Sequence, residues 1–210
     1  MKKSEYYEER ALDRIISLSD AVFAFSLTLQ AVDLIVPDSS PGESFLIAHK
    51  LLAEWPSFVY FLLTFFITGA FWFSHHRIFR FVRRYDDMLM RLNLYYLLFI
   101  VMMPFSTKLL HEYGDNQDAV IISCLLYATP GLLLSGMWYY ASKGHYLIDE
   151  HIPHDFITLI NLKNIITPCV FLTSILLTFI HPYYAMYFWT ILIPAMYIIE
   201  RRYGDVIEKD

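Results

Sequence analysis

Polar and ionisable side chains are concentrated in the first apolar segment of this 210-residue chain. Between Arg14 and Asp33 the sequence places Asp20, Gln30 and several hydroxyl side chains among apolar residues. A charged group at membrane depth costs about 2.5–3.5 kcal/mol on insertion scales, so it usually faces a partner or water. We therefore expect this segment to face other helices or an ion path and not to be a plain lipid-facing anchor.

A second set of polar residues lies in the next two apolar segments. His75 and His76 come near the end of one, and Asn93 comes near the start of the other. A hydrogen-bonded network at the cytoplasmic ends of three successive helices would satisfy these groups and hold the helices together. Its candidate members are Ser19, Asp20, Asn93 and either His75 or His76.

Simpler interpretations of the same residues stay open. Ser19-Asp20 is a good N-cap pair, because a short acceptor satisfies the orphan N–H groups of a helix start. Arg14 has a stem long enough to snorkel to the headgroups. The histidine pair would serve equally as an interfacial cluster beside Arg77 without binding a ligand.

Metal or haem chemistry is the enzymatic alternative, and the sequence gives it little support. Di-iron membrane enzymes need several His-rich clusters, whereas His75-His76 is accompanied only by scattered histidines in one loop, His145, His151 and His154. That loop is read as solvated, with cation binding or pH sensing as the alternative. The two cysteines sit in apolar runs, and no phosphate-binding loop, zinc-protease motif or nucleophile elbow occurs. We expect no enzyme activity, no metal site and no cofactor.

Composition identifies the solvent of this chain. Hydrophobic residues make up 57% and charged residues 18%, and the mean hydropathy is +0.42. An average soluble domain has roughly 45–50% apolar and about 25% charged residues. The excess indicates a lipid bilayer, and the formal net charge of -5 argues against a nucleic-acid partner.

Six apolar segments are each long enough to span a membrane. They predict an all-α, six-transmembrane-helix domain over residues 1–210. The expected helices cover about 14–36, 55–79, 88–110, 120–142, 157–180 and 183–200. Pro37 ends the first, and Pro104 should kink the third unless a neighbouring group takes up the carbonyl that it frees.

Basic residues orient these segments. With the N-terminus inside, every Lys and Arg except Lys50 and Lys108 falls on the cytoplasmic side. An odd number of spans would destroy this asymmetry. The sequence therefore predicts a multi-pass protein with both termini cytoplasmic, in the plasma (inner) membrane if the source is prokaryotic.

Three motifs resemble those of a known family. Arg14, then Leu18-Ser19-Asp20 followed by Phe23-Ala24, resembles the Arg-x-x-x-Phe-Ser-Asp signature of the transmembrane protein 175 family of potassium channels. The stretch from Trp72 to Phe79 and Asn93 with Pro104-Phe105 are similar to that family's second and third helices. The motifs cover the first half of the chain, and the second half agrees in length and helix count.

This resemblance implies a homotetrameric cation channel whose first helix lines a central pore. Carried over residue by residue, the pore and gate fall on Phe25, Thr28, Leu29 and Val32. Four copies of this apolar stripe would form stacked collars that gate by dewetting, in place of a carbonyl selectivity filter. The resemblance also implies a structural lock that holds the first helix: Arg14, Ser19, Asp20, Trp72, His75, His76 and Asn93.

Some positions depart from the family pattern. Leu18 stands for the family's Phe, and Phe25 stands where a branched aliphatic residue is usual. Gln30 replaces a usual apolar residue, and the sequence leaves open whether it faces the pore or a neighbouring subunit. Without the resemblance, ordinary helix packing would explain the apolar stripe equally well.

Our hypothesis is a channel permeable to potassium ions, with modest preference over sodium because apolar collars do not replace a hydration shell. The alternative is a proton-coupled cation transporter that uses Asp20, Asp33 and the histidine pair as a relay. His75 and His76 also suggest that conduction depends on pH.

Overall fold

The computed structural model describes residues 3–32 and 54–192 and the single positions 34, 49, 52, 194, 195, 198 and 201; for 3–11 it describes only the backbone. Within these ranges the chain is helical, with one isolated antiparallel bridge between Val82 and Ile148. The helices are α1 Lys3–Val32, α3 Trp55–Phe81, α4 Asp87–Val101, α5 Met103–Tyr113, α6 Gln117–Ser142, the 3-10 turn η1 Lys143–His145, α7 His154–Thr178 and α8 Pro182–Trp189.

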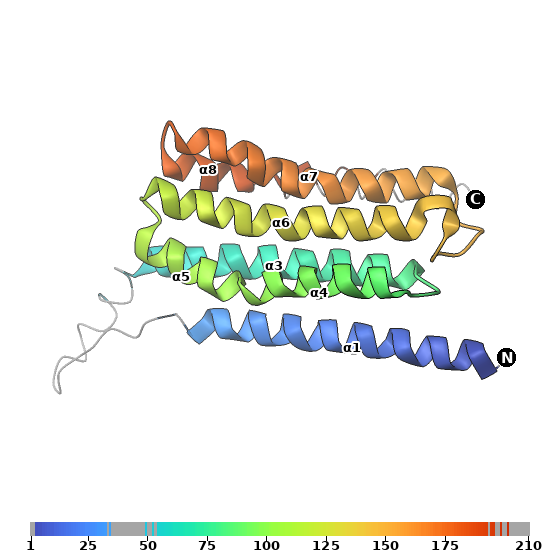
Figure 1. The fold of residues 1–210 in the computed structure, drawn as a ribbon. Coiled ribbons are helices and arrows are strands. Elements are labelled where there is room, and N and C mark those ends of the chain that lie inside the picture. The colour runs from blue at the N-terminus through green and yellow to red at the C-terminus, as the bar shows by residue number, and fades with distance from the viewer. Residues whose placement is uncertain are drawn as a thin grey trace.

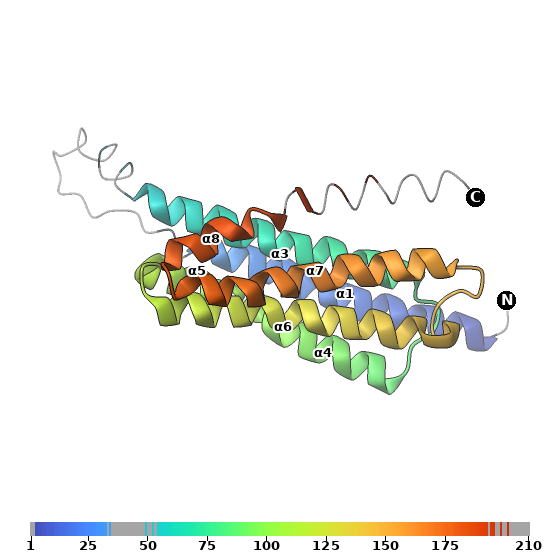
Figure 2. The same ribbon diagram turned by 90° about the horizontal axis from the view of Figure 1, so that it is seen from above.

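The helices form one elongated bundle with their axes along its length (Figure 1). α1 lies along one edge and packs on α3, α4 and α5. α6 lies in the middle, and α7 and α8 cover its other side (Figures 1 and 2). No described helix lies beyond α1 at its edge of the bundle (Figure 1).

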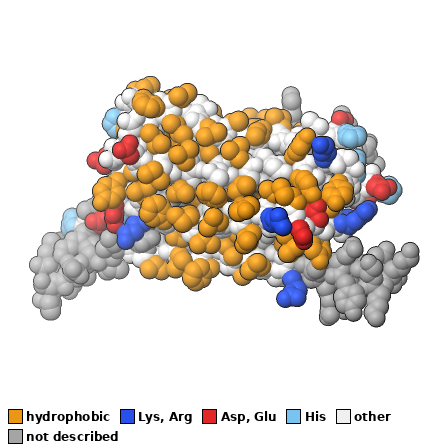
Figure 3. All heavy atoms as spheres, viewed as in Figure 1, with side chains coloured by type: hydrophobic (Ala, Val, Ile, Leu, Met, Phe, Trp, Pro, Cys, Tyr) orange, Lys and Arg blue, Asp and Glu red, His pale blue; other side chains and the backbone are white. Residues whose placement is uncertain are grey.

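Five of the described helical segments are long and apolar enough to cross a membrane, which makes the chain a multi-pass membrane protein. Hydrophobic side chains cover the middle of the face drawn in Figure 3, and charged side chains gather toward its two ends. We call the end with the α3–α4 and α6–α7 connections the arginine end, because Arg80, Arg83, Arg84 and Arg91 lie there. The opposite end, with the α5–α6 and α7–α8 connections, is called the far end.

The observed helix bounds correct several predicted ones. α1 begins at Lys3, well before the predicted start near residue 14, and residues 33, 35 and 36 of the predicted segment lie outside the described chain. The predicted third helix, 88–110, is two helices that meet at Met102. Pro104 causes the break, because it has no N–H for the carbonyl four residues earlier. α8 starts the predicted sixth segment, 183–200, whose later part lies largely outside the described residues.

Capping residues fix where several helices begin. The Asp86 side chain accepts the N–H of Leu89 at 2.9 Å at the start of α4. The Asn116 side chain accepts the N–H of Asp118 at 2.8 Å at the start of α6. Such caps satisfy the N–H groups that a helix start leaves unpaired.

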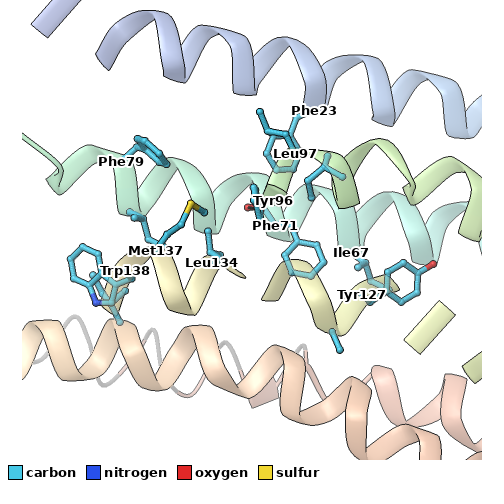
Figure 4. Close-up of a cluster of buried hydrophobic side chains, with 14 of the residues drawn as sticks. Phe23, Ile67, Phe71, Phe79, Tyr96, Leu97, Tyr127, Leu134, Met137 and Trp138 are labelled. Carbon is cyan, nitrogen blue, oxygen red and sulfur yellow. Dashed lines mark hydrogen bonds between the residues drawn. The ribbon is translucent and has the colours of Figure 1, made fainter. Parts of the chain in front are cut away.

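Aromatic and aliphatic side chains from α1, α3, α4, α5, α6, α7 and α8 form the core. Figure 4 shows Phe23 from α1, Phe71 from α3 and Tyr96 from α4 beside one another, with α6 residues such as Leu134 behind them. Phe23 and Tyr96 are 6.0 Å apart between ring centroids and are fully buried. The core therefore attaches the inner face of α1 to the rest of the bundle.

Candidate functional site

The two faces of α1 differ in burial and in chemistry. The inner face is buried against the bundle and carries Leu12, Ser19, Phe23, Ser26 and Gln30. The outer face carries exposed apolar side chains, including Leu18, Phe25 and Val32. Three of the five buried residues are polar, which is costly in a membrane unless each finds a hydrogen-bond partner.

Ser19, Asn93 and His75 form a buried hydrogen-bonded chain between α1, α4 and α3. The amide of Asn93 donates to Ser19 Oγ at 3.1 Å, and the hydroxyl of Ser19 donates to the carbonyl of Ile15 at 2.9 Å. His75 Nε2 lies 2.9 Å from Asn93 Oδ1. Because this oxygen only accepts, the contact requires the proton of His75 to be on Nε2.

Aromatic rings hold the His75 imidazole in place. The ring stacks on Phe79 at 4.4 Å and on Tyr96 at 5.4 Å between centroids. The hydroxyl of Tyr96 donates to the carbonyl of Phe71 at 3.0 Å, which fixes the Tyr96 ring as well. His75 is 1% exposed, so its neighbours in the bundle determine its orientation.

Asp20 makes a separate contact with α3. The indole N–H of Trp72 donates to Asp20 Oδ1 at 2.8 Å. α1 begins at Lys3, so Ser19-Asp20 is in the middle of this helix. The interpretation of this pair as an N-cap is therefore wrong. The described hydrogen bonds of this cluster do not include Arg14, which is exposed, or His76, whose ring lies 5.8 Å from that of Trp72. The structure thus brings together five of the seven residues predicted for the lock.

Ser26 meets the break between α4 and α5. Its hydroxyl donates to the carbonyl of Ile100 at 2.7 Å. Ile100 is four residues before Pro104, so its carbonyl is the one that the proline leaves without a helical donor. The pore-helix candidate α1 is therefore attached to α4 at the position where that helix is interrupted.

Gln30 faces its own subunit. Its side chain is 0% exposed, and its amide donates to the hydroxyl of Thr68 on α3 at 2.8 Å. Thr107 of α5 donates to the hydroxyl of Thr64, one turn from Thr68, at 2.8 Å. Gln30 Oε1 finds no partner among the described residues, and a buried unpaired acceptor costs about 1–3 kcal/mol.

Sequence reasoning did not identify Ser26 and the three threonines of α3 and α5. Each of these residues is common in membrane helices, where Ser and Thr satisfy the backbone of their own turn. A single sequence does not show which hydroxyl side chain bonds to another helix. For Ser26 the available signal was its position seven residues after Ser19, on the same face of α1. Thr64, Thr68 and Thr107 are on other helices, so that signal does not apply to them.

The predicted pore residues lie on the outer face of α1. Phe25 is 62% exposed and Val32 is 75% exposed, while Leu29 is half-buried at the margin of that face. The exposed Thr28 donates to the carbonyls of Ala24 and Phe25, so its hydroxyl is engaged by its own helix. Burial within the subunit therefore does not explain the apolar character of Phe25 and Val32.

The histidine loop at the arginine end forms a local structure. The N–H groups of Arg83 and Arg84 donate to the carbonyl of Leu147 at 2.8 and 3.2 Å. His151 donates through its backbone N–H and its ring to Asp149, which lowers the pKa of that carboxyl. The carboxylate in turn raises the pKa of His151. Among the described residues no group of three His, Cys, Asp or Glu side chains is arranged to hold a metal ion.

Three comparisons show what this chain is similar to. A family model described as the endosomal/lysosomal potassium channel TMEM175 matches residues 14–104. A potassium channel of Streptomyces collinus is 31% identical over 144 residues, which are 66% of this chain and 68% of that protein. The chain belongs to the TMEM175 family. The prediction from the motifs is thereby confirmed.

A solved TMEM175 structure supports the fold. The crystal structure of a lysosomal potassium-selective channel TMEM175 homolog from Chamaesiphon minutus matches with a TM-score of 0.77 and 26% identity. The match covers 90% of this chain and 97% of that one. The all-α membrane fold and its helix order are therefore those of TMEM175 proteins. As members of this family are channels, the prediction that the chain is not an enzyme is also confirmed.

The vertebrate relatives are larger and carry a different description. The human protein, an endosomal/lysosomal proton channel TMEM175, is 26% identical over 140 residues. Those residues are 66% of this chain but only 27% of the human protein. The residues matched by the family model include α1, α3 and α4, so the shared part contains the buried polar contacts of α1.

Proposed function

We propose that this chain forms a potassium-permeable cation channel whose pore is lined by α1. The observation that carries the proposal is the division of α1 into a polar, buried inner face and an apolar, exposed outer face. A helix that only packed against lipid would not need Ser19, Ser26 and Gln30 bonded to other helices. Such bonds fix the rotation of α1 and therefore the direction in which Phe25, Leu29 and Val32 point.

Four copies of the chain would complete the pore. The outer face of α1 is unpaired in one subunit, and a homotetramer with α1 at the axis would bring four copies of that face together. Rings of Phe25, Leu29 and Val32 would then constrict the path, and an apolar constriction gates by excluding water. Asp20, Ser19 and Asn93 serve as the lock that keeps each helix at its place around the axis.

The charge distribution orients the channel. Arginine residues at the α3–α4 connection belong on the cytoplasmic side, because basic residues are retained there. We infer that the arginine end, where α1 begins, is cytoplasmic. In a prokaryotic cell the channel would lie in the inner membrane.

Potassium as the permeant ion is supported by the relatives. The Streptomyces collinus protein is named a potassium channel, and the Chamaesiphon minutus homolog is described as potassium-selective. Apolar rings do not replace the hydration shell of an ion as carbonyl rings do. We therefore expect selectivity for potassium over sodium to be modest. No cofactor is needed for this passive transport.

Single-channel recording in planar bilayers with a potassium-to-sodium gradient tests the proposal. We expect discrete openings with a reversal potential on the potassium side, and an altered conductance for Leu29→Ala. The matched control is Leu176→Ala, which removes an exposed leucine from α7. A silent wild-type protein with intact tetramers, or equal effects of the two leucine variants, would refute the α1-lined channel.

The proton-coupled transporter remains the competing mechanism, and the same preparation distinguishes it. Asp20 accepts from Trp72 and His75 donates to Asn93, whereas Asp33 lies outside the described residues. Asp20→Asn keeps an oxygen that accepts the Trp72 N–H but removes the titratable group. A channel with this substitution still conducts potassium without a proton gradient, whereas a transporter that relies on Asp20 loses its proton-driven flux.

A further inference from the structure

The far half of α1 is bonded to the bundle separately from the Ser19–Asn93–His75 contact. Gln30 is two turns beyond Phe23 and is fully buried beside α3. Its amide donates to Thr68, and the hydroxyl of Thr68 donates to the carbonyl of Thr64 at 2.8 Å. Gln30 is also next to Leu29 and two residues from Val32, the two outermost predicted pore positions.

The same turn of α3 also receives a hydrogen bond from α5. Thr107 donates to the hydroxyl of Thr64 at 2.8 Å, and Thr64 donates its own proton to the carbonyl of Tyr60 at 2.9 Å. Thr64, Thr68 and Thr107 are buried. One helical turn, Thr64–Thr68, therefore receives a hydrogen bond from α1 and another from α5.

The helix that spans α4 and α5 is interrupted between them. α5 meets α4 at Met102, and Pro104 prevents the helical hydrogen bond that would make the two continuous. Breaks of this kind are positions at which a helix changes direction with little other rearrangement. The hydroxyl of Ser26 on α1 is bonded to the carbonyl of Ile100 at this break.

Resting on the proposed channel function, we infer that Gln30, Thr68, Thr64 and Thr107 form a latch that couples the position of α5 to the outer constriction of the pore. A tilt of α5 about the break displaces Thr107 and with it the Thr64–Thr68 turn. That turn holds the Gln30 amide, so the displacement reaches Leu29 and Val32. Gln30, Thr68, Thr64 and Thr107 are positioning residues, because they do not face the ion path.

The unpaired oxygen of Gln30 makes the latch testable without loss of the fold. Thr68→Val alone leaves the Gln30 amide without its acceptor, so both ends of a buried amide are then unpaired. The double variant Gln30→Leu with Thr68→Val replaces donor and acceptor with apolar groups of similar size, which is close to neutral. We expect the tetramer of the double variant to melt at a higher temperature than that of Thr68→Val.

Recording from Gln30→Leu, Thr107→Val and their combination tests the coupling. Without the latch, the outer constriction formed by Leu29 and Val32 can widen and fill with water. Open probability should then rise and the potassium-to-sodium permeability ratio should fall. The loss of one hydrogen bond corresponds to a change of roughly threefold to tenfold in such an equilibrium. The open probability and permeability ratio of the combined variant should differ from wild type no more than those of the stronger single variant, because both substitutions release the same α3 turn.

Thr129→Val is the matched control. Thr129 donates to Leu125 of its own helix at 2.8 Å, so its loss should leave open probability and selectivity unchanged. Wild-type gating in Gln30→Leu and Thr107→Val, or effects that multiply as for independent sites, would overturn the latch. If Leu29→Ala still alters conductance in that case, the channel function stands and only the latch fails.

Discussion

Among the described residues, helices α1 to α5 share more hydrogen bonds with one another than α6 and α7 do. In α1 to α5, buried polar groups donate from one helix to another, as in Ser26 to Ile100 and Gln30 to Thr68. In α6 and α7, buried hydroxyls such as Ser123 and Ser174 donate to carbonyls of their own helix at 2.9 and 2.6 Å. α6 and α7 are joined by a buried hydrogen bond, from the indole N–H of Trp138 to the carbonyl of Ile157 at 3.1 Å, and by a longer one from Gln117 to Thr178 at 3.5 Å. Most of their contact is aromatic and aliphatic packing, for example Tyr127 with Phe171 at 5.1 Å between ring centroids.

This difference indicates where precise placement is needed. An interhelical hydrogen bond fixes the rotation of a helix, whereas apolar packing tolerates several arrangements of similar energy. In the proposed channel α1 presents one face to the pore, so its rotation would matter for conduction. α6, α7 and α8 serve as a scaffold whose density matters more than its exact rotation.

We expect the largest loss of stability from a substitution that breaks the Ser19–Asn93–His75 hydrogen bonds. Asn93→Leu leaves the buried Nε2–H of His75 without an acceptor and removes the Asn93–Ser19 bond between α4 and α1, while the Ser26–Ile100 bond between these helices remains. A stranded buried donor and the lost interhelical bond together cost about 2–3 kcal/mol. That loss corresponds to a melting temperature about 5–10 °C lower, measured on tetramers in detergent. An unchanged melting temperature would show that packing alone holds α1.

A packing defect in the second half should lower stability without changing selectivity. A Cβ on Gly131 would lie 2.8 Å from Pro168 Cδ, so Gly131→Val forces α6 and α7 apart and costs about 1–3 kcal/mol. Gly136→Ala is the control, because nothing lies within 4 Å of its added Cβ. Melting curves and permeability ratios are measured together. A shift in the potassium-to-sodium ratio of Gly131→Val would contradict the division of roles.

A matched pair of serines compares the two kinds of hydrogen bond directly. Ser26→Ala removes the donor from the Ile100 carbonyl at the α4–α5 break and should cost about 1 kcal/mol. Ser123→Ala removes a bond within one helix and should cost less than about 0.5 kcal/mol, since alanine favours the helix. The comparison fails if both variants lose the same stability in thermal unfolding.

We expect the smallest effect on stability from the exposed His151–Asp149 pair at the arginine end, which makes none of the buried contacts compared above. Because the pKa of His151 is raised in the folded protein, its contribution to folding stability is complete below the ordinary pKa of 6.5 and is lost as pH rises through the higher, folded-state pKa. The lowered pKa of Asp149 means that its contribution is complete above 3.8 and is lost as pH falls. The pair is therefore best formed between about pH 4 and 6.5, where His151→Ala should lower the melting temperature slightly. Equal melting of variant and wild type at pH 5 and at pH 9 would exclude this contribution.

Much of the fold could be predicted from local signals. Long apolar segments, Pro104 and the caps at Asp86 and Asn116 act within a few residues, so they are readable from sequence. The start of α1 could not be predicted in this way, because the charged residues before Arg14 do not fit an apolar pattern although the helix continues through them.

Which side chains bond to each other in the candidate site depends on how the helices pack. His75 and His76 are adjacent and chemically identical, yet a helix turns about 100° per residue, so only one can face Asn93. Gln30 had two predicted environments, and the structure places it in a third, against α3 of its own subunit.

The amino-acid sequence alone is enough to show that this chain resides in a membrane, that its segments are helical and that its motifs are those of the TMEM175 family. These properties follow from composition, from local hydrogen bonding and from short patterns. The folded chain was needed to show which face of α1 is buried, which hydroxyl groups bond to another helix and which carbonyl at the α4–α5 break accepts from Ser26. Those outcomes depend on the distance between residues far apart in sequence, which is set when the helices pack.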